Sequence, residues 1–538
     1  QSLTLQEIPD TIIPRAHLAT VNYSTGVITI ANSETIDVTP SNRVNFSHIF
    51  VSNVTGDKKI PLTDSELVSV VDGLNFTFRM SEPERVASIE NSGTNGGDSI
   101  PVTLSLERKA YHDIGLNGVE EILALHVIEI GDTVPPLGLS ASIDYGTGVL
   151  IINTTETIDT TPVSNVDVAR MYIGDSSAYK NISLTGLQVT PLDALFITIQ
   201  LDEVARIAAL SISGTPGGDG DPAFVNIDPV TFKDIAQNHI LQSQSFSLDE
   251  TADEIKPTFV SGSLNLSTGF MLLYFSETIR TTPSSSVKLV DMALPNRTSV
   301  LSDLLLTGAI VTEENNRDKS VKMLLNDLQR VTAIRRSDQR GGDGVSLFLN
   351  INQNAVVDMA GNGVVAKTST IAQYADVVDP FVRTITLNMT NGKMVLNISE
   401  IVDVGSLNVS LVAFMNKTTG SHEVILSGAD VMPGDSYLAT IMLTESQRVK
   451  AIEASATPGG DGEGIFSTVY NGAFQDYGEN FVNLNANLAV EEIPDIENPR
   501  LLTANINYGT GIIIVESSET LDLTPNTLLN LGNCFIEN

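Results

Sequence analysis

The chain has 538 residues, 42% of them hydrophobic, and its 65 acidic and 30 basic side chains give a net charge of −35. An acidic surface disfavours nucleic acid and anionic membranes as partners, because both are bound through basic faces. Tryptophan is absent and aromatic residues make up only 5% of the chain, which leaves little surface for stacking sugar rings. No apolar run approaches the roughly 18 residues that a membrane-spanning helix needs.

Three landmarks recur along the chain with a period of about 120 residues. They are a Gly-Gly-Asp turn, an arginine upstream of it, and a glutamate further upstream near the end of an extended run. The first glycines of the turns are Gly96, Gly217, Gly341 and Gly459, the arginines are Arg85, Arg206, Arg330 and Arg448, and the glutamates are Glu34, Glu156, Glu277, Glu400 and Glu519. These structural markers predict a tandem array.

The markers divide the chain into four complete repeats between two partial ones. The predicted ranges are 1–12 for the end of a preceding repeat, 13–133, 134–255, 256–378 and 379–496 for repeats 1 to 4, and 497–538 for the start of a fifth repeat. Residues 1–7 have neither the basic start nor the apolar block of a signal peptide. We therefore expect the sequence to be a window on a longer array.

Each repeat opens with a proline and two extended runs around a tight turn. In repeat 2 these runs are 139–144 and 149–153, and the turn is Tyr145-Gly-Thr-Gly148. Flanks rich in Val and Ile with glycine at the end of the turn predict a β-hairpin. Further along, residues 201–210 have apolar residues at helical spacing. This pattern predicts a short helix, which the following Gly-Gly pair is expected to end.

The second half of each repeat contains a loop that begins with Asp and ends with Asn. In repeat 2 these residues are Asp234 and Asn238. This pairing predicts a turn stabilised by side-chain hydrogen bonds. Each repeat then has about seven or eight short strands with turn signals every 8 to 12 residues, which predicts an all-β chain of antiparallel sandwiches. Short proline-containing linkers predict that the sandwiches stack end to end as a rod.

Two motifs of repeat 3 carry a family resemblance. Phe275-Ser-Glu-Thr278 and Asp358-Met-Ala-Gly-Asn362 resemble the opening strand and closing loop of bacterial-type Ig-like repeats of extracellular proteins. Ser399-Glu400-Ile401 departs from the first pattern, because it lacks the threonine. The short helix followed by Gly-Gly-Asp is similar to arrays in cell-surface and mastigoneme-type (flagellar-hair) proteins of heterokont algae. The resemblance implies tandem Ig-like β-sandwiches in a structural protein of the cell surface.

Acidic residues in the Gly-Gly-Asp turns are the candidate metal ligands, because calcium binds six to eight oxygen atoms. Asp219 with Asp221, and Asp461 with Glu463, follow the turns of repeats 2 and 4. The alternative is that these acids only close a turn, since Asp98 of repeat 1 has no second acid beside it. We expect no cofactor, with calcium as the alternative.

The recurring arginine and glutamate suggest a charge pair, because a buried arginine needs a carboxylate or carbonyl partner. Arg206 and Glu156 are the candidate pair of repeat 2. We predict that Arg206, Arg330 and Arg448 each hydrogen-bond an acid or a backbone carbonyl within their own repeat. The alternative is that each is a plain, exposed arginine on its helix.

Asn-x-Ser/Thr sequons make N-linked glycans expected partners if the protein is secreted. The candidate asparagines are Asn22, Asn45, Asn53, Asn75, Asn153, Asn181, Asn265, Asn296, Asn388, Asn397, Asn408 and Asn416. The single cysteine, Cys534, cannot form an intrachain disulfide, and whether it pairs outside this chain is open.

Catalysis is not expected. The six histidines share no repeat phase, and Gly-Gly-Asp-Gly follows a helix instead of opening one, which is the wrong order for cradling phosphate. The leading hypothesis is a glycosylated, non-catalytic subunit of an extracellular filament or surface fibre that self-assembles with other copies of itself. The alternatives are an adhesin stalk and a calcium-stiffened surface-layer (S-layer) protein.

Overall fold

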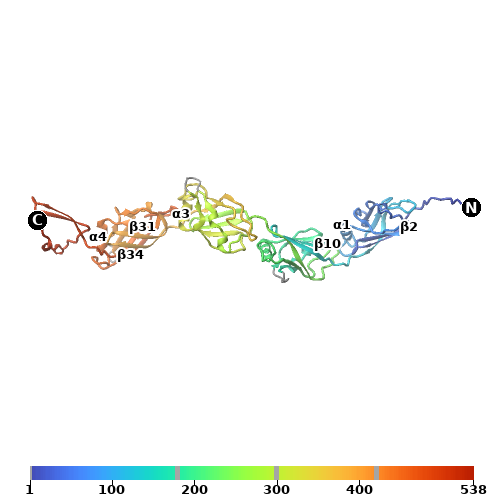
Figure 1. The fold of residues 1–538 in the computed structure, drawn as a ribbon, viewed down its shortest axis with the longest axis horizontal. Coiled ribbons are helices and arrows are strands. Elements are labelled where there is room, and N and C mark those ends of the chain that lie inside the picture. The colour runs from blue at the N-terminus through green and yellow to red at the C-terminus, as the bar shows by residue number, and fades with distance from the viewer. Residues whose placement is uncertain (1–2, 176–181, 296–301, 417–422, 538) are drawn as a thin grey trace. The chain divides into compact units, whose positions relative to one another are not determined.

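The computed structural model describes residues 3–175, 182–295, 302–416 and 423–537 (Figure 1). The chain divides into two compact units, one of residues 1–255 with 359–362 and the other of residues 256–358 with 363–538. It is an all-β protein of tandem Ig-like sandwiches, and the described residues form four separate apolar cores. Among the described residues, no helix is both long and apolar enough to cross a membrane.

Each sandwich contains short strands and one α-helix. Repeat 1 contains β1 (Ala16–Asn22), β2 (Val27–Ile36), β3 (Ile49–Ser52), β4 (Lys59–Pro61), β5 (Glu66–Leu67), β6 (Gly73–Arg79), α1 (Glu82–Glu90), β7 (Thr103–Leu106) and β8 (Ile122–Ile130). Repeat 2 contains β9 (Gly138–Asp144), β10 (Val149–Ile158), β11 (Met171–Gly174), β12 (Ile182–Ser183), β13 (Gln188–Val189), β14 (Ala194–Gln200), α2 (Glu203–Ser211), β15 (Phe224–Ile227) and β16 (Gln244–Thr251).

The second unit repeats this order. Repeat 3 contains β17 (Phe259–Asn265), β18 (Phe270–Phe275), β19 (Met292–Leu294), β20 (Leu304–Leu305), β21 (Ile310–Val311), β22 (Ser320–Leu324), α3 (Asp327–Arg335), β23 (Phe348–Ile351), β24 (Lys367–Thr370) and β25 (Ala372–Tyr374). Repeat 4 contains β26 (Val382–Asn388), β27 (Lys393–Asp403), β28 (Val412–Asn416), β29 (Val424–Ile425), β30 (Asp430–Val431), β31 (Ser436–Met442), α4 (Glu445–Glu453), β32 (Ile465–Val469), β33 (Gln475–Asp476) and β34 (Asn485–Ile493). The hairpin of β35 (Leu501–Asn507) and β36 (Ile512–Ser517) follows.

The last strand of a repeat connects the two layers of its sandwich. In repeat 1 the strand order is β4-β3-β7-β8-β1-β2-β6-β5. The first half of β8 pairs antiparallel with β7, and its second half pairs parallel with β1. In repeat 2, β16 pairs with β15 and β9 in the same way. In repeat 3 the strand is interrupted at Ile371, so that β24 and β25 belong to separate sheets.

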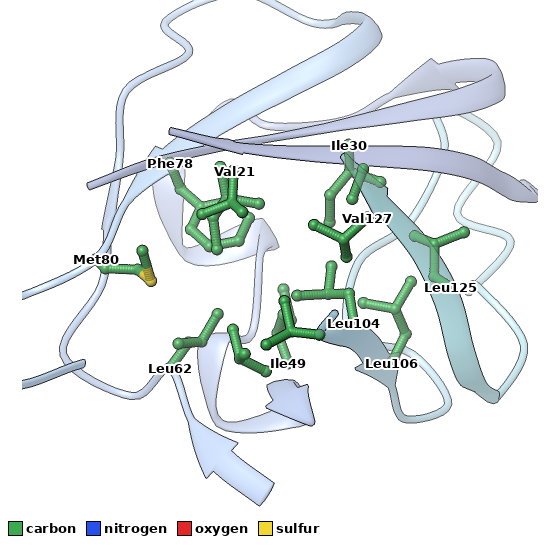
Figure 2. Packing of buried hydrophobic residues seen from close by; sticks show 14 of the residues in the cluster. Val21, Ile30, Ile49, Leu62, Phe78, Met80, Leu104, Leu106, Leu125 and Val127 are labelled. Atoms are coloured by element: carbon green, nitrogen blue, oxygen red, sulfur yellow. The ribbon is translucent and has the colours of Figure 1, made fainter. Parts of the chain in front are cut away.

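Alternation of side chains along the strands builds each core. In β2, buried and half-buried positions alternate over its first six residues, as expected for a strand with one face on a core. Figure 2 shows Val21 and Ile30 of one layer facing Ile49 of the other across the core of repeat 1. All three side chains are buried, so the hydrophobic effect holds the layers together.

The predicted hairpin is confirmed in repeat 2. β9 and β10 pair antiparallel with Asp144 opposite Val149, and Gly148 has a φ of +70° at the end of the turn. A positive φ of this size favours glycine, because a Cβ would crowd the backbone. The predicted helix is also present, as α2.

The Gly-Gly pair does not end that helix, contrary to the prediction. α2 ends at Ser211, and its C-cap residue Ile212 has a φ of −113°, outside the left-handed region. The amide of Ile212 closes the last helical turn by donating to the Ala209 carbonyl. Gly217, with a φ of +98°, belongs to the separate turn that follows.

Candidate functional site

The arginine of each helix is buried in a cluster of acids. Arg85 of α1 is only 7% exposed. Its Nη1 donates to Asp132 Oδ2 at 2.7 Å and to the Tyr23 carbonyl at 3.1 Å. Its Nη2 donates to Glu156 Oε2 at 3.0 Å, and its Nε donates to Glu82 Oε2 at 2.7 Å. All three guanidinium nitrogens therefore have acceptors, which a buried arginine requires.

The other helices place their arginines in the same way, which confirms the hydrogen-bond prediction. The partners are the Tyr145 carbonyl and Asp253 for Arg206, the Leu266 carbonyl and Asp376 for Arg330, and the Met389 carbonyl and Asp495 for Arg448. The acid three residues before each arginine completes the set, namely Glu82, Glu203, Asp327 and Glu445. Each arginine thus binds acids and a carbonyl of its own repeat.

The predicted pairing of Arg206 with Glu156 is wrong. Glu156 accepts instead from Arg85 of the preceding repeat. Arg206 lies beside Gly148 at the start of β10, whereas Glu156 lies near the end of that strand, about 25 Å away at the usual rise per residue. In the second unit, Glu400 and Glu519 likewise accept from the arginine of the preceding helix. The glutamate is therefore a link between successive repeats.

A third carboxylate completes the cluster. The carboxylate oxygens of Asp132, Glu156 and Asp234 lie within 4.8 Å of one another, as do those of Asp376, Glu400 and Asp476. We call each trio, together with the helix arginine and the acid three residues before it, an arginine clamp. Figure 1 shows α1 next to β10, where the first clamp forms.

Burial shapes the protonation of the clamp. It raises the pKa of Glu156 to about 8, while Arg85 opposes this shift and the charges of Asp132 and Asp234 add to it. Burial raises the pKa of Asp234 to about 6, against the hydrogen bonds from Asn238. The clamp therefore holds more carboxylates than its single guanidinium can neutralise.

The Asp-to-Asn loop holds two aspartates of the clamp in place through hydrogen bonds. Asp234 Oδ1 accepts from the Asn238 amide at 2.8 Å, and Asp234 Oδ2 accepts from Asn238 Nδ2 at 2.9 Å. These bonds confirm the predicted side-chain-stabilised turn. Asn238 Nδ2 also donates to the Asp132 carbonyl at 3.3 Å. The loop thereby fixes the linker aspartate as well as its own carboxylate.

The Gly-Gly-Asp turn forms a second contact between successive repeats. A Cβ on Gly96 would lie 2.0 Å from the carbonyl oxygen of Ile235, and one on Gly341 would lie 1.7 Å from that of Tyr477. The turn of one repeat therefore lies directly against the Asp-to-Asn loop of the next. Ile235 and Ala236 are 7% and 1% exposed because they insert into the apolar core of repeat 1.

The structure places the candidate calcium ligands in exposed turns. Asp219 Oδ1 accepts from the Asp221 amide at 3.0 Å, and Asp461 Oδ1 accepts from the Glu463 amide at 3.0 Å. Neither pair belongs to a group of three or more potential metal ligands within the described ranges. Calcium binding at these residues stays a prediction.

The sequons differ widely in exposure. Asn45, Asn75, Asn153 and Asn408 are exposed, and Asn22, Asn53, Asn265, Asn388 and Asn397 are half-buried. Asn416 is 5% exposed, and its Nδ2, the atom that would carry a glycan, donates to Asp461. Asn181 and Asn296 lie outside the described residues. Cys534 is exposed, with a free thiol.

Sequence reasoning missed the linker aspartate, which accepts a hydrogen bond of 2.6 to 2.8 Å from the helix arginine in each repeat. The signal was present, because Asp10, Asp132, Asp253, Asp376 and Asp495 each lie four residues before the proline that opens a repeat. It went unused because a single acid in a linker resembles ordinary solvated charge.

Neither a protein-family model nor a curated protein sequence matches the chain. Among solved structures, the chain is similar to domains 1–6 of the surface layer protein SbsC, with 10% identity and a TM-score of 0.16 over 94% of this chain and 58% of that one. For the N-terminal part of the bacterial S-layer protein SbsC, the identity is 10% and the TM-score 0.17, over 35% of this chain and 44% of that one.

The four N-terminal Ig domains of Dscam1 isoform 6.44 match with 9% identity and a TM-score of 0.15, over 89% of this chain and 98% of that one. TM-scores this low identify no relative. The role of this chain therefore rests on its own contacts.

Proposed function

We propose that this chain is a non-catalytic structural segment of an extracellular filament or surface fibre, built from tandem Ig-like repeats and bearing N-linked glycans. The arginine clamp is the observation that supports the proposal. Each clamp draws charged groups from two successive repeats into one buried cluster, together with an inserted apolar loop. Such joins suit an array whose stability is the sum of its repeats and their interfaces.

The charge of the chain supports specific assembly over nonspecific association. A net charge of −35 makes copies repel one another, so contact requires complementary groups at defined places. Copies that meet head to tail without closing a ring form open filaments. The partners proposed here are therefore other copies of the same protein.

Electron microscopy of negatively stained native material tests the proposal. Regular fibres with an axial repeat are expected, and labelling with an antibody against this chain should follow that repeat. Isolated beaded rods would support the adhesin stalk instead. A melting temperature that falls when a chelator is added would support the calcium-stiffened surface-layer protein.

A further inference from the structure

Asp10, Glu34 and Asp113 form a face with the same carboxylates as a clamp, but no arginine of the described residues lies among them. The carboxylate oxygens of this trio lie within 4.8 Å of one another, as in the complete clamps. Glu34 Oε1 is buried and accepts no hydrogen bond among the described residues. The hydrogen bonds around the trio and an exposed isoleucine beside it match groups that are covered in the complete clamps.

The trio is held by the same hydrogen bonds as its counterpart in repeat 2. Asp113 accepts from the amide and Nδ2 of Asn117 at 2.8 and 3.0 Å, as Asp234 does from Asn238. Asn117 Nδ2 also donates to the Asp10 carbonyl at 3.3 Å. The carboxylates are therefore arranged as in a clamp although no guanidinium is present.

An exposed isoleucine, Ile114, lies next to one of the three carboxylates in the sequence. Ile114 follows Asp113 just as Ile235 follows Asp234. Ile235 is 7% exposed inside the core of the preceding repeat, whereas Ile114 is 56% exposed. In the second unit, Tyr477 occupies this loop position and packs on the core of repeat 3. Ile235 and Tyr477 are therefore both covered by the preceding repeat, whereas Ile114 is not.

We propose that Asp10, Glu34, Asp113 and Ile114 form a docking face for the helix end of another repeat of this type. That partner presents an arginine one turn into a short helix, with an acid three residues before it, and a Gly-Gly-Asp turn. Its guanidinium donates to Asp10 and Glu34, as Arg85 donates to Asp132 and Glu156, and its glycine turn covers Ile114. The docking face stands whether or not the chain belongs to a fibre.

An extended chain tests the docking face directly. A second copy of residues 134–252 is joined to Asp10 in place of residues 1–9, which keeps the natural spacing from the linker aspartate to the next proline. Hydrogen exchange is then followed by mass spectrometry in residues 31–37 and 112–118. The expected result is exchange about tenfold slower than in the chain without the added copy.

Two matched controls accompany this measurement. Arg206→Met in the added copy should remove most of the added protection. Exchange in the strands of the added copy should match that of repeat 2, which shows that the copy has folded. A folded copy that leaves residues 31–37 and 112–118 unprotected would overturn the proposal.

The unextended chain offers a second test. Residues 153–159 and 233–238, which are covered by the first clamp, should exchange at least about tenfold more slowly than residues 31–37 and 112–118. Arg85→Met should raise their exchange towards that of the uncovered face. Equal exchange at the two faces of the unaltered chain would contradict the proposal whatever the extended chain does.

Discussion

At the residue scale, the arginine of each clamp is a buried charge held by buried carboxylates. Arg330 is 3% exposed and donates to Asp376 Oδ2 at 2.6 Å and to Glu400 Oε2 at 2.7 Å. Ion pairs of this kind contribute little net stability when intact, because both partners lose their hydration. Their removal is costly, because the remaining charges stay buried without a partner.

Arg330→Met is expected to lower the free energy of unfolding by about 3 to 5 kcal/mol, since it leaves buried carboxylates uncompensated. Urea unfolding followed by circular dichroism measures the loss. The matched control is Arg383→Met, since Arg383 is exposed and donates to the Ser399 carbonyl. That variant should lose about 0.5 kcal/mol or less. Equal losses from the two variants would show that the clamp arginine stabilises the fold no more than an exposed arginine does.

The protonation of Glu400 makes the second unit sensitive to pH. Burial raises the pKa of Glu400 to about 7, against Arg330, while Asp476 and Asp376 add to the shift. A pKa raised in the folded state means that the folded state binds the proton more tightly. The stability gained is complete below the unfolded pKa of about 4.5 and is lost as the pH rises through about 7.

The free energy of unfolding of the second unit should therefore fall between about pH 5 and pH 8, by on the order of 2 to 3 kcal/mol. Thermal unfolding at a series of pH values at fixed ionic strength measures this change. Glu400→Gln, which stays neutral, should flatten the profile. A stability that rises over the same interval would contradict the raised pKa.

At the element scale, the Gly-Gly-Asp turn touches the next repeat through its backbone. Gly341 and Gly344 both have a positive φ, of +76° and +81°. A Cβ on Gly344 would meet nothing within 4 Å, whereas one on Gly341 would meet the Tyr477 carbonyl. Substituting the two glycines in turn therefore distinguishes the cost of backbone strain from the cost of lost contact between repeats.

Gly344→Ala should cost about 1 kcal/mol, the strain of a left-handed alanine. Gly341→Ala should cost a further 1 to 3 kcal/mol or so, because the turn and the loop must move apart. Hydrogen exchange in residues 475–480 should rise only in the Gly341 variant. Similar exchange in both variants would mean that the turn does not support the loop.

Local patterns were enough to predict the elements of each repeat. The hairpin around Gly148 follows from alternation and turn chemistry within a dozen residues, and the turn at Asp234 follows from one Asp–Asn pair. The helix was predicted, but the Gly-Gly pair was assigned to its end because glycines often stop helices. The actual role of that turn depends on the next repeat, which no local pattern contains.

The clamp could not be predicted for the same reason. Arg85 and Glu156 are 71 residues apart and belong to different repeats. The period of about 120 residues shows that both recur, but it does not show which copy of one meets which copy of the other. Only the lengths and directions of the strands place Glu156 beside the preceding helix.

At the scale of the whole molecule, the core of repeat 1 is completed by residues of repeat 2. Ile235 belongs to repeat 2 by sequence but lies in the core of repeat 1. A substitution at Ile235 should therefore lower the stability of the neighbouring sandwich, repeat 1. Nearest-neighbour coupling of this kind is what distinguishes a tandem array from beads on a flexible string.

Ile235→Ala should destabilise repeat 1 by about 2 to 4 kcal/mol, because it leaves a cavity in that core. Hydrogen exchange resolved by repeat measures the effect, which should appear in β6 of repeat 1. The matched control is Ile114→Ala at the same loop position, where the side chain is 56% exposed. That variant should change stability by about 0.5 kcal/mol at most. If Ile235→Ala instead loosens only the strands of repeat 2, the repeats are independent and the clamp does not couple them.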